Sequence, residues 1–412
     1  MTRAALGMAL LLSYAVLTLW VEERWTWSLF QVAVFTAATC WAVRQLWRPS
    51  PMAASVWLVP LCAAPAWGLL QLALNHTVYR WATWNVVLNW ATYLVLFFLA
   101  LQIFQRSAAR HWFLRFALYF GFALSVLSTV QLLTSGGRIF WLFPSGHTAF
   151  VLGPFVYHNQ YAAFLEMIFP IALWQALWGS SWDRRGFAAG LMAAALFASA
   201  VAAASRAGTA LMCLETIAVL LLAVSRGMVA GGAVARSFAK FAVVAVVFAA
   251  IVGWNVLWQR FRLTDHTVRR ELLASSMAML RDRPVMGFGL GNWPRAYPQY
   301  ALFDDGTYVN QAHNDWAQWA VEGGAPFFLI LLSLVVMVFP AAVRSLWGVG
   351  LVSVWLHCLV DYPLAQRPGF GAWFFVLLGV LASARTYRAT SAAPHTTGSR
   401  AATVKPANEV PV

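Results

Sequence analysis

Long apolar runs, separated by short polar connections, make up most of the chain. A run of about 17–25 mostly apolar residues is long enough to cross a bilayer as a helix. The segment 259–314 is the one long polar connection, and residues 384–412, rich in Ala, Thr and Pro, are typical of a disordered tail. The pattern predicts an all-α polytopic membrane protein whose membrane domain covers residues 1–383. About twelve transmembrane helices are expected, at residues 4–20, 27–43, 52–74, 82–104, 111–133, 159–177, 186–204, 208–224, 238–258, 315–339, 346–361 and 369–383.

Composition supports this class. Of the 412 residues, 61% are hydrophobic and 10% are charged, whereas soluble domains carry about 25% charged residues. The formal net charge of +14 would suggest nucleic-acid binding in a soluble protein. Here the basic residues lie in loops between apolar runs, so we expect a lipid bilayer and no nucleic acid as the partner. The four cysteines lie in apolar runs without metal-ligand spacing, so neither a disulfide framework nor a zinc site is expected.

The distribution of basic residues predicts the orientation, because cytoplasmic loops of membrane proteins are enriched in Lys and Arg. With an even number of spans, both termini lie on the same side. The connections on that side are the basic ones, as at Arg44, Arg48 and Arg106. We therefore expect cytoplasmic termini, with the long loop outside the cytoplasm. The short connections on the outer side hold only Arg24, Arg80, Arg138, Arg206 and Arg367.

The stretch QAHNDWAQWAVEGG at residues 311–324 places three polar residues where an apolar helix begins. In the simpler interpretation, Asn314 and Asp315 are helix caps and the neighbouring histidine has no function. On the outer side of the membrane, however, His313 could act as a general base, because an imidazole accepts a proton near neutral pH. Both interpretations stay open on this stretch alone.

Three arginines on the outer side could bind an anion. Arg206 lies at a short break before an apolar run, where the helix start and the guanidinium both favour phosphate. An interfacial arginine that holds lipid headgroups is the equal alternative. Arg269 and Arg270 open an amphipathic helix in the long loop. The GFGLG stretch at 287–291 does not fit a dinucleotide-binding fingerprint, because it follows a helix rather than a strand.

Carboxylates are few on the outer side and do not cluster with histidines at ligand spacing, so no metal site is expected. Asp304 and Asp305 are typical of a solvated loop pair. Glu166 and Glu215 lie inside predicted helices, where ionisable groups are costly and often functional. Each of these two glutamates could line a cavity or pair with an arginine.

The motifs YHNQYAAFLEMIFP, SRAG, AHNDWAQWAVEGG and LVDYPL, with the segment 269–291, lie in order between residues 155 and 365. In order, spacing and topology this region resembles the O-antigen ligase/polymerase superfamily (the Wzy-C type) of bacterial envelope glycosyltransferases. The resemblance implies a GT-C-like helical bundle in the inner membrane. It also implies transfer of a glycan from an undecaprenyl-pyrophosphate donor at the periplasmic face, without a metal or other cofactor.

The resemblance implies roles for individual residues. His313 matches the histidine proposed as general base, and Arg206 matches the arginine that opens a periplasmic-side helix. Arg269 matches the large-loop arginine, with Arg270 as a close alternative, so these arginines are expected to bind the donor pyrophosphate. Asn159 and Asp361 match less firmly placed positions. Further supporting roles are open for Asn314, Glu166 and Glu215.

The acceptor stays open at this stage. Family members transfer the glycan to lipid A-core, to another lipid-linked glycan or to a protein. An O-antigen ligase is our expectation, with a polysaccharide polymerase and a protein O-oligosaccharyltransferase as alternatives. A transporter or flippase is the alternative from another class, and it should show internal repeats and charges in the middle of spans. The distinctive polar groups of this chain gather instead on one face. A purely structural assembly scaffold is the third class.

Overall fold

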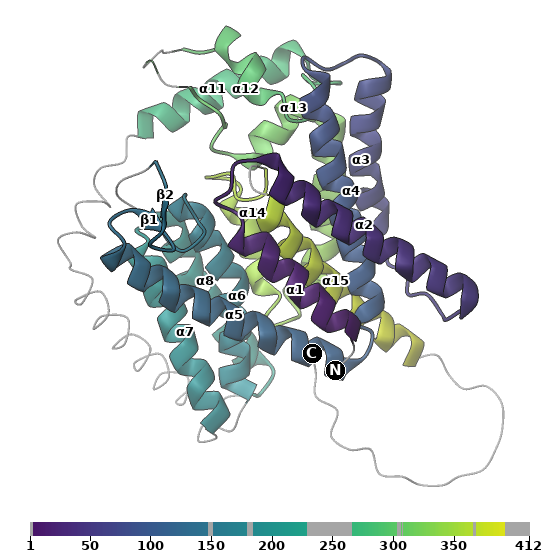
Figure 1. Cartoon of the computed structure of the whole chain (residues 1–412), viewed down its shortest axis with the longest axis vertical. Helices are drawn as coiled ribbons and strands as arrows, with labels where there is room; N and C mark the ends of the chain where they lie inside the picture. The colour runs from purple at the N-terminus through teal and green to yellow at the C-terminus, as the bar shows by residue number, and fades with distance from the viewer. Residues whose placement is uncertain are drawn as a thin grey trace.

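Helices form nearly all of the regular structure (Figure 1). Two strands, β1 (Arg138–Ile139) and β2 (Phe143–Pro144), pair as a short antiparallel hairpin. The predicted all-α class is confirmed for the described part of the chain. The computed structural model describes residues 3–146, 151–178, 184–228, 266–302, 306, 308–365 and 368–391.

The helices follow the apolar runs along the chain, and further short helices lie in the long loop. The helices before that loop are α1 (Arg3–Leu17), α2 (Arg24–Trp47), α3 (Leu58–Ala73), α4 (Arg80–Ile103), α5 (Ser107–Thr134), α6 (His158–Trp178), α7 (Arg184–Ala202) and α8 (Arg206–Ser225). Helices α11 (His266–Asp282) and α12 (Trp293–Ala296) lie within the loop, and α13 (Asp315–Ala342), α14 (Val349–His357) and α15 (Pro368–Ser391) follow it.

Seven of the described helices are long and apolar enough to cross a membrane, so the expected count of about twelve is not confirmed. The expected span 346–361 contains only α14, whose 9 residues rise about 13 Å, against about 30 Å for the hydrocarbon core. This helix is short because the chain turns before it, where the Gly348 N–H bonds to the Ser345 hydroxyl, and again after His357. The expected span 238–258 lies outside the described residues.

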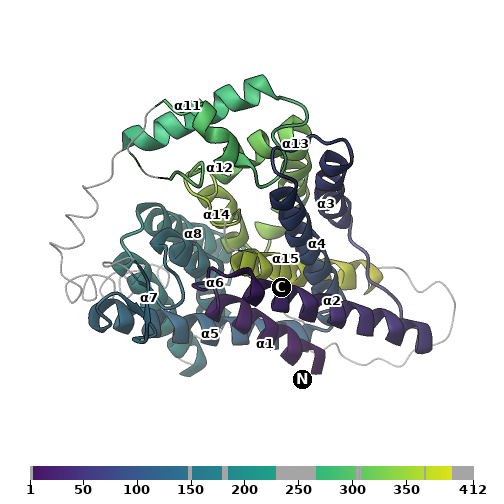
Figure 2. The same cartoon turned by 45° about the horizontal axis from the view of Figure 1, so that its top comes forward.

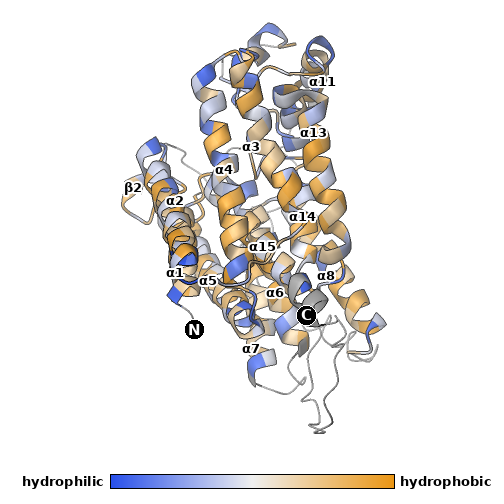
Figure 3. Cartoon of the chain, turned by 90° about the vertical axis from the view of Figure 1, so that its right-hand side faces the viewer, coloured by the Kyte–Doolittle hydropathy of each residue, from blue (hydrophilic) through white to orange (hydrophobic). Residues whose placement is uncertain are grey.

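Helices α6 and α15 lie at the centre of the bundle. Residues 159–172 of α6 and 369–384 of α15 are all buried, as expected for helices that are apolar on every side. Around them pack α4 on α15, and α7, α8 and α14 on α6. Figure 3 shows apolar residues along most of α3, α4 and α13, as contact with a bilayer requires. Helix α15 continues to Ser391, past the expected start of the tail, and residues 392–412 lie outside the described ranges.

A second, smaller core lies at one end of the bundle, where α11 and α12 cover the start of α13 (Figure 2). Leu272 and Met279 of α11 pack there with Trp293 of α12 and Val321 of α13. The Trp293 indole N–H donates to the Ser276 hydroxyl at 3.1 Å. This core therefore fixes the described part of the long polar loop onto the membrane helices, and with it the N-terminal arginines of α11.

The glycine-rich stretch 284–291 forms a latch against α13. The Gly289 N–H donates to the Glu322 carbonyl at 2.9 Å, and the Gly291 N–H donates to Glu322 Oε2 at 2.7 Å. Gly289 has a φ of 91°, which a side chain would strain. Helix α13 breaks at Gly324, with a φ of 68°, and the next N–H bonds to the Pro284 carbonyl at 2.8 Å. The glycines of this latch thus serve backbone packing.

Glu322→Leu is expected to loosen the latch. The Glu322 carboxylate is buried and accepts the N–H groups of Gly291 and Trp293 at 2.7 and 3.2 Å. Its removal leaves these two N–H groups and the Gln318 amide, which also donates to Oε1 at 3.1 Å, without their acceptor, at about 1–3 kcal/mol for each buried donor. Thermal unfolding of the purified protein in detergent should show a lower melting temperature, with faster protease cleavage between residues 284 and 300. The control Glu22→Leu replaces an exposed carboxylate and should change stability by less than about 0.5 kcal/mol. Equal melting temperatures for the two variants would contradict the role of Glu322.

Candidate active site

The carboxylate of Asp361, in the loop after α14, is the centre of a buried polar cluster. The side chain of Asp361 is 1% exposed. Its Oδ2 accepts hydrogen bonds from the Tyr157 hydroxyl, at 2.9 Å, and from the Asn159 amide. Its Oδ1 accepts the Tyr362 N–H at 2.9 Å. The start of α6 and the end of α14 are therefore joined through one carboxylate.

A guanidinium and an imidazole face the same carboxylate. Arg269 Nη2 lies 3.6 Å from Oδ2, while Nη1 donates to the Val360 carbonyl at 2.9 Å. His313 Nδ1 lies 3.7 Å from Oδ1, too far for a hydrogen bond but close enough for an ion pair once the imidazole is protonated. The Arg269 and His313 side chains are 33% and 28% exposed, so a ligand can reach both. The Asp361 cluster consists of Tyr157, Asn159, Arg269, His313, Asp361 and Tyr362.

The environment keeps Asp361 ionised. Burial raises the pKa of its carboxyl, but the interaction with His313 and the charges of His357 and Arg269 outweigh burial, so the pKa lies below its ordinary value. Burial and the negative charge of Asp361 raise the pKa of the Tyr157 hydroxyl well above its usual range. At neutral pH the cluster therefore holds a carboxylate and a phenol that donates to it.

The three polar residues at the start of α13, His313, Asn314 and Asp315, have two different roles. Asn314 is the N-cap: its side chain accepts the Ala317 N–H at 2.9 Å, and its amide donates to a carbonyl of the loop after α14. Asp315 is buried and accepts the Leu364 N–H at 2.9 Å. Both residues hold the loop that carries Asp361. His313, with a φ of 51°, turns its ring toward Asp361 instead. The helix-cap interpretation thus fits Asn314, while the geometry leaves His313 available for chemistry.

Two tyrosines complete the cluster, and sequence reasoning missed both. The rings of Tyr157 and Tyr362 stack, with centroids 5.2 Å apart and planes at 6°. The His313 and Tyr362 rings meet edge to face, with centroids 4.7 Å apart, so the tyrosine limits how the imidazole can rotate. Their positions in the motifs YHNQY and LVDYPL, beside Asn159 and Asp361, are the sequence feature that could have identified them as site residues.

Of the three expected anion-binding arginines, the structure brings only Arg269 into the Asp361 cluster. Arg270, the next residue, is exposed. Arg206 is half-buried and opens α8 behind its N-cap, Ser205. A Cβ on Gly208 would meet Ala162 of α6, so α6 and α8 begin at the same end of the bundle. Arg206 therefore lies at the end that carries the cluster, on a neighbouring helix.

The two glutamates within helices lie outside the cluster, and both are buried. Glu166 of α6, which could have lined a cavity or paired with an arginine, contacts a histidine instead: its Oε1 lies 2.7 Å from His357 Nδ1. Glu215 is buried on α8, which packs against both α6 and α14. His357 was not a candidate from sequence, because it lies within an apolar run and matches no ligand spacing.

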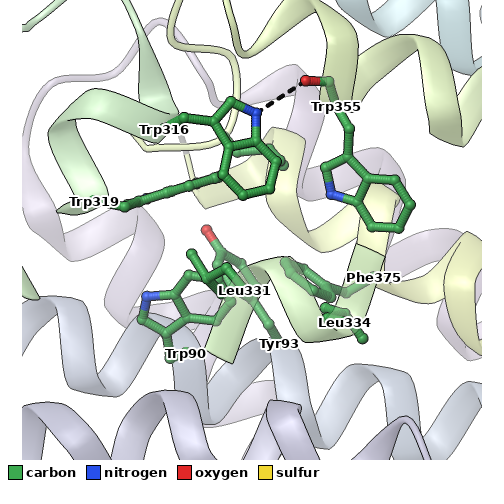
Figure 4. Close-up of a pocket in the computed structure, with 9 residues that line it drawn as sticks. Trp90, Tyr93, Trp316, Trp319, Leu331, Leu334, Trp355 and Phe375 are labelled. Atoms are coloured by element: carbon green, nitrogen blue, oxygen red, sulfur yellow. Dashed lines mark hydrogen bonds between the residues drawn. The ribbon is translucent and has the colours of Figure 1, made fainter. Parts of the chain in front are cut away.

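An aromatic pocket lies between α4, α13, α14 and α15 (Figure 4). Two of its lining residues are close in sequence to the site, because Trp316 follows Asp315 and Leu364 lies three residues after Asp361. The Trp316 indole N–H donates to the Trp355 carbonyl at 3.1 Å across the pocket. The pocket thus brings together apolar side chains from four helices, α4, α13, α14 and α15. The aromatic lining is formed by Trp90, Tyr93, Trp316, Trp319, Trp355 and Phe375.

The arrangement suits proton transfer beside an anion. In the described residues, no three His, Cys, Asp or Glu side chains are grouped as metal ligands. Because Nδ1 of His313 faces Asp361, Nε2 remains to take a proton from a ligand hydroxyl, and the carboxylate would stabilise the resulting imidazolium. The Arg269 guanidinium offers further donors for phosphate oxygens.

Comparisons with known proteins agree with the resemblance seen in the motifs. No curated protein matches the chain. The family match includes Arg206, Arg269 and His313, whereas Asn159 lies shortly before its first residue and Asp361 lies 29 residues after its last. Residues 163–332 match the family model described as O-antigen ligase, and this match supports the resemblance to the O-antigen ligase/polymerase superfamily of membrane glycosyltransferases.

Proposed function

We propose that the protein is an O-antigen ligase, which transfers a glycan from undecaprenyl pyrophosphate to lipid A-core at the periplasmic face of the inner membrane. One observation carries the proposal: His313 faces a buried, ionised Asp361 beside the partly exposed Arg269, at one end of an apolar helical bundle. The family match over residues 163–332 supports the same reaction class. The orientation with both termini in the cytoplasm is part of this proposal.

In the proposed reaction, His313 Nε2 takes the proton of an acceptor hydroxyl as that oxygen attacks the anomeric carbon of the glycan. The bond from this carbon to the pyrophosphate oxygen breaks, and undecaprenyl pyrophosphate leaves. Asp361 stabilises the imidazolium that forms. Arg206 and Arg269 stabilise the departing charge, which preorganised cationic donors can do without a metal ion. A single displacement of this kind inverts the configuration at the anomeric carbon.

Donor and acceptor make different demands on the site. The pyrophosphate needs cationic groups, which Arg269 supplies in the cluster and Arg206 supplies nearby. The polyprenyl chain needs apolar surface, which the membrane helices provide. A polymerase or a protein oligosaccharyltransferase would use the same donor chemistry, so the acceptor alone separates these activities.

The acceptor is tested by the glycan profile of a strain that lacks this protein. For a ligase, we expect all long chains to disappear from lipid A-core while they accumulate on the lipid carrier. Single-repeat caps on lipid A-core would indicate a polymerase instead. Intact lipopolysaccharide with an unglycosylated surface protein would indicate a protein oligosaccharyltransferase, and an unchanged profile would contradict all three.

Arg206→Lys is expected to weaken donor binding. A lysine keeps the charge but cannot form the two parallel hydrogen bonds of a guanidinium with phosphate. Loss of one charge-assisted hydrogen bond, about 1.5–3 kcal/mol, corresponds to a donor KM raised about tenfold or more. Initial rates of transfer at varied donor concentration measure the change. Arg138→Lys is the control, because this arginine is exposed and lies in another loop of the predicted outer side. A parental donor KM for Arg206→Lys would exclude Arg206 from pyrophosphate binding.

A further inference from the structure

A second polar contact joins α6 to α14, deeper in the bundle than the Asp361 cluster. Glu166 Oε1 and His357 Nδ1 are 2.7 Å apart, and both side chains are 0% exposed. The second carboxylate oxygen, Glu166 Oε2, and the second ring nitrogen, His357 Nε2, have no hydrogen-bond partner among the described residues. Glutamate and histidine are thus held together inside the bundle, where the buried carboxyl of Glu215 on α8 lies close enough to interact with Glu166.

Stability alone is a poor explanation for such a pair. Ionisable groups at membrane depth are costly even when they are paired. Well-packed apolar residues in place of a buried pair are often equally or more stabilising, whereas removal of one partner is destabilising. A buried pair of this kind indicates a role that apolar residues cannot fill, which is to hold α6 and α14 in one relative position.

The positions of these residues along the two helices show which part of the site the Glu166–His357 contact supports. Asn159 and Glu166 are seven residues apart, so they lie on the same face of α6. On the facing segment, His357, the partner of Glu166, is the last residue of α14, and Asp361, the partner of Asn159, lies in the turn that follows. Two polar contacts therefore join the helices, with Asn159–Asp361 in the Asp361 cluster and Glu166–His357 beneath it.

The backbone connects the lower contact directly to the upper one. The His357 carbonyl accepts the N–H groups of Val360, at 2.9 Å, and of Asp361, at 3.0 Å. This turn presents the Asp361 carboxylate to His313 and the Val360 carbonyl to Arg269. A shift of the His357 ring would move the turn, and with it the partners of both the imidazole and the guanidinium.

We propose that Glu166 and His357 form a positioning pair that fixes the turn carrying Asp361, and so sets the alignment of Asp361 with His313. This role rests on the proposed function of the Asp361 cluster. Neither residue touches the reacting atoms. The pair acts on kcat through geometry, because small displacements of catalytic groups lower the rate strongly.

The test uses the double variant Glu166→Leu/His357→Leu in the full-length protein. The single variant Glu166→Leu leaves a buried, unpaired imidazole and should lower the melting temperature, while the double variant should recover it. We expect kcat of the double variant, per folded molecule, to stay about tenfold to 100-fold below the parental value. Undecaprenyl-pyrophosphate-linked glycan and lipid A-core serve as donor and acceptor. Glu166→Gln, which keeps a hydrogen bond to Nδ1, should return kcat to within about threefold of the parental value.

The control is Gln102→Leu, which removes an amide of α4 that bonds to both backbone groups of Ala53 at 2.8 and 3.0 Å. It should lower the melting temperature without lowering kcat. A double variant with restored stability and parental kcat would overturn the positioning role. A double variant that does not recover stability would overturn it too, because the pair would then chiefly hold the bundle together. The two proposals fail in different ways. If the parental protein transfers glycan and His313→Ala does not, either of these double-variant results refutes only the positioning role, and the proposed function stands. No transfer by the parental protein would instead refute the proposed function.

Discussion

His313→Ala is expected to lower kcat for glycan transfer by about 10²–10⁴-fold, the usual contribution of general-base catalysis. The imidazole belongs to the Asp361 cluster and is partly exposed, with Nδ1 directed at the carboxylate. Donor binding should survive, because the pyrophosphate is assigned to arginines. Initial rates of the purified variant, at saturating donor and acceptor, measure the change.

Asn314→Ala provides the contrast for this prediction. Loss of its N-cap hydrogen bond to Ala317 should lower the free energy of unfolding by about 1 kcal/mol. The kcat per folded molecule should fall much less than in His313→Ala, because Asp315 still holds the loop that carries Asp361. If His313→Ala, present in membranes at the normal level, transfers glycan at the parental rate, His313 is not the base. The triplet would then be a helix cap beside a histidine without function.

Asp361→Asn is expected to reduce kcat by about 10²–10⁴-fold. Asparagine has nearly the same shape but removes the negative charge that stabilises the imidazolium of His313. In the Ser-His-Asp template, the equivalent change at the carboxylate costs about 10⁴-fold in kcat. The carboxylate also aligns Arg269, at 3.6 Å, so the donor KM should rise as well. Steady-state kinetics with both substrates varied separate the two effects, and a parental kcat would show that His313 works without the carboxylate.

The same variant tests the ionisation of Asp361. Its folded-state pKa lies below the ordinary value, so its contribution to stability is fully present above the unfolded pKa, about 3.9. The contribution is lost as pH falls through the lower, folded-state pKa. The difference in free energy of unfolding between parental protein and Asp361→Asn should therefore be constant between about pH 5 and 8 and shrink below about pH 4. A difference that grows in acid would contradict an ionised carboxylate.

The helical class followed from sequence because the bilayer allows few structures to an apolar run. The number of spans did not, since hydropathy measures only composition. The run 346–361 is as apolar as a true span, yet turns at Ser345 and after His357 leave α14 with 9 residues. The break of α13 at Gly324 was hidden in the same way, because its cause is a contact with Pro284 from the long loop.

The site was predictable where motif positions were informative. His313, Arg269, Asn159 and Asp361 were all candidates, and the structure brings these four together. The choice of Arg269 over Arg270 depends on the rotation of α11, which its packing on α13 sets. His357 gave no signal in the sequence, because Glu166, its partner in the structure, lies 191 positions away.

The most direct test is transfer by the purified protein in proteoliposomes that contain undecaprenyl-pyrophosphate-linked glycan and lipid A-core. We predict that glycan appears on lipid A-core in equal amount to the free undecaprenyl pyrophosphate released, and that His313→Ala forms neither product. Exchange of lipid-linked glycan between the two leaflets, with no glycan on any acceptor, would contradict the account and indicate transport instead.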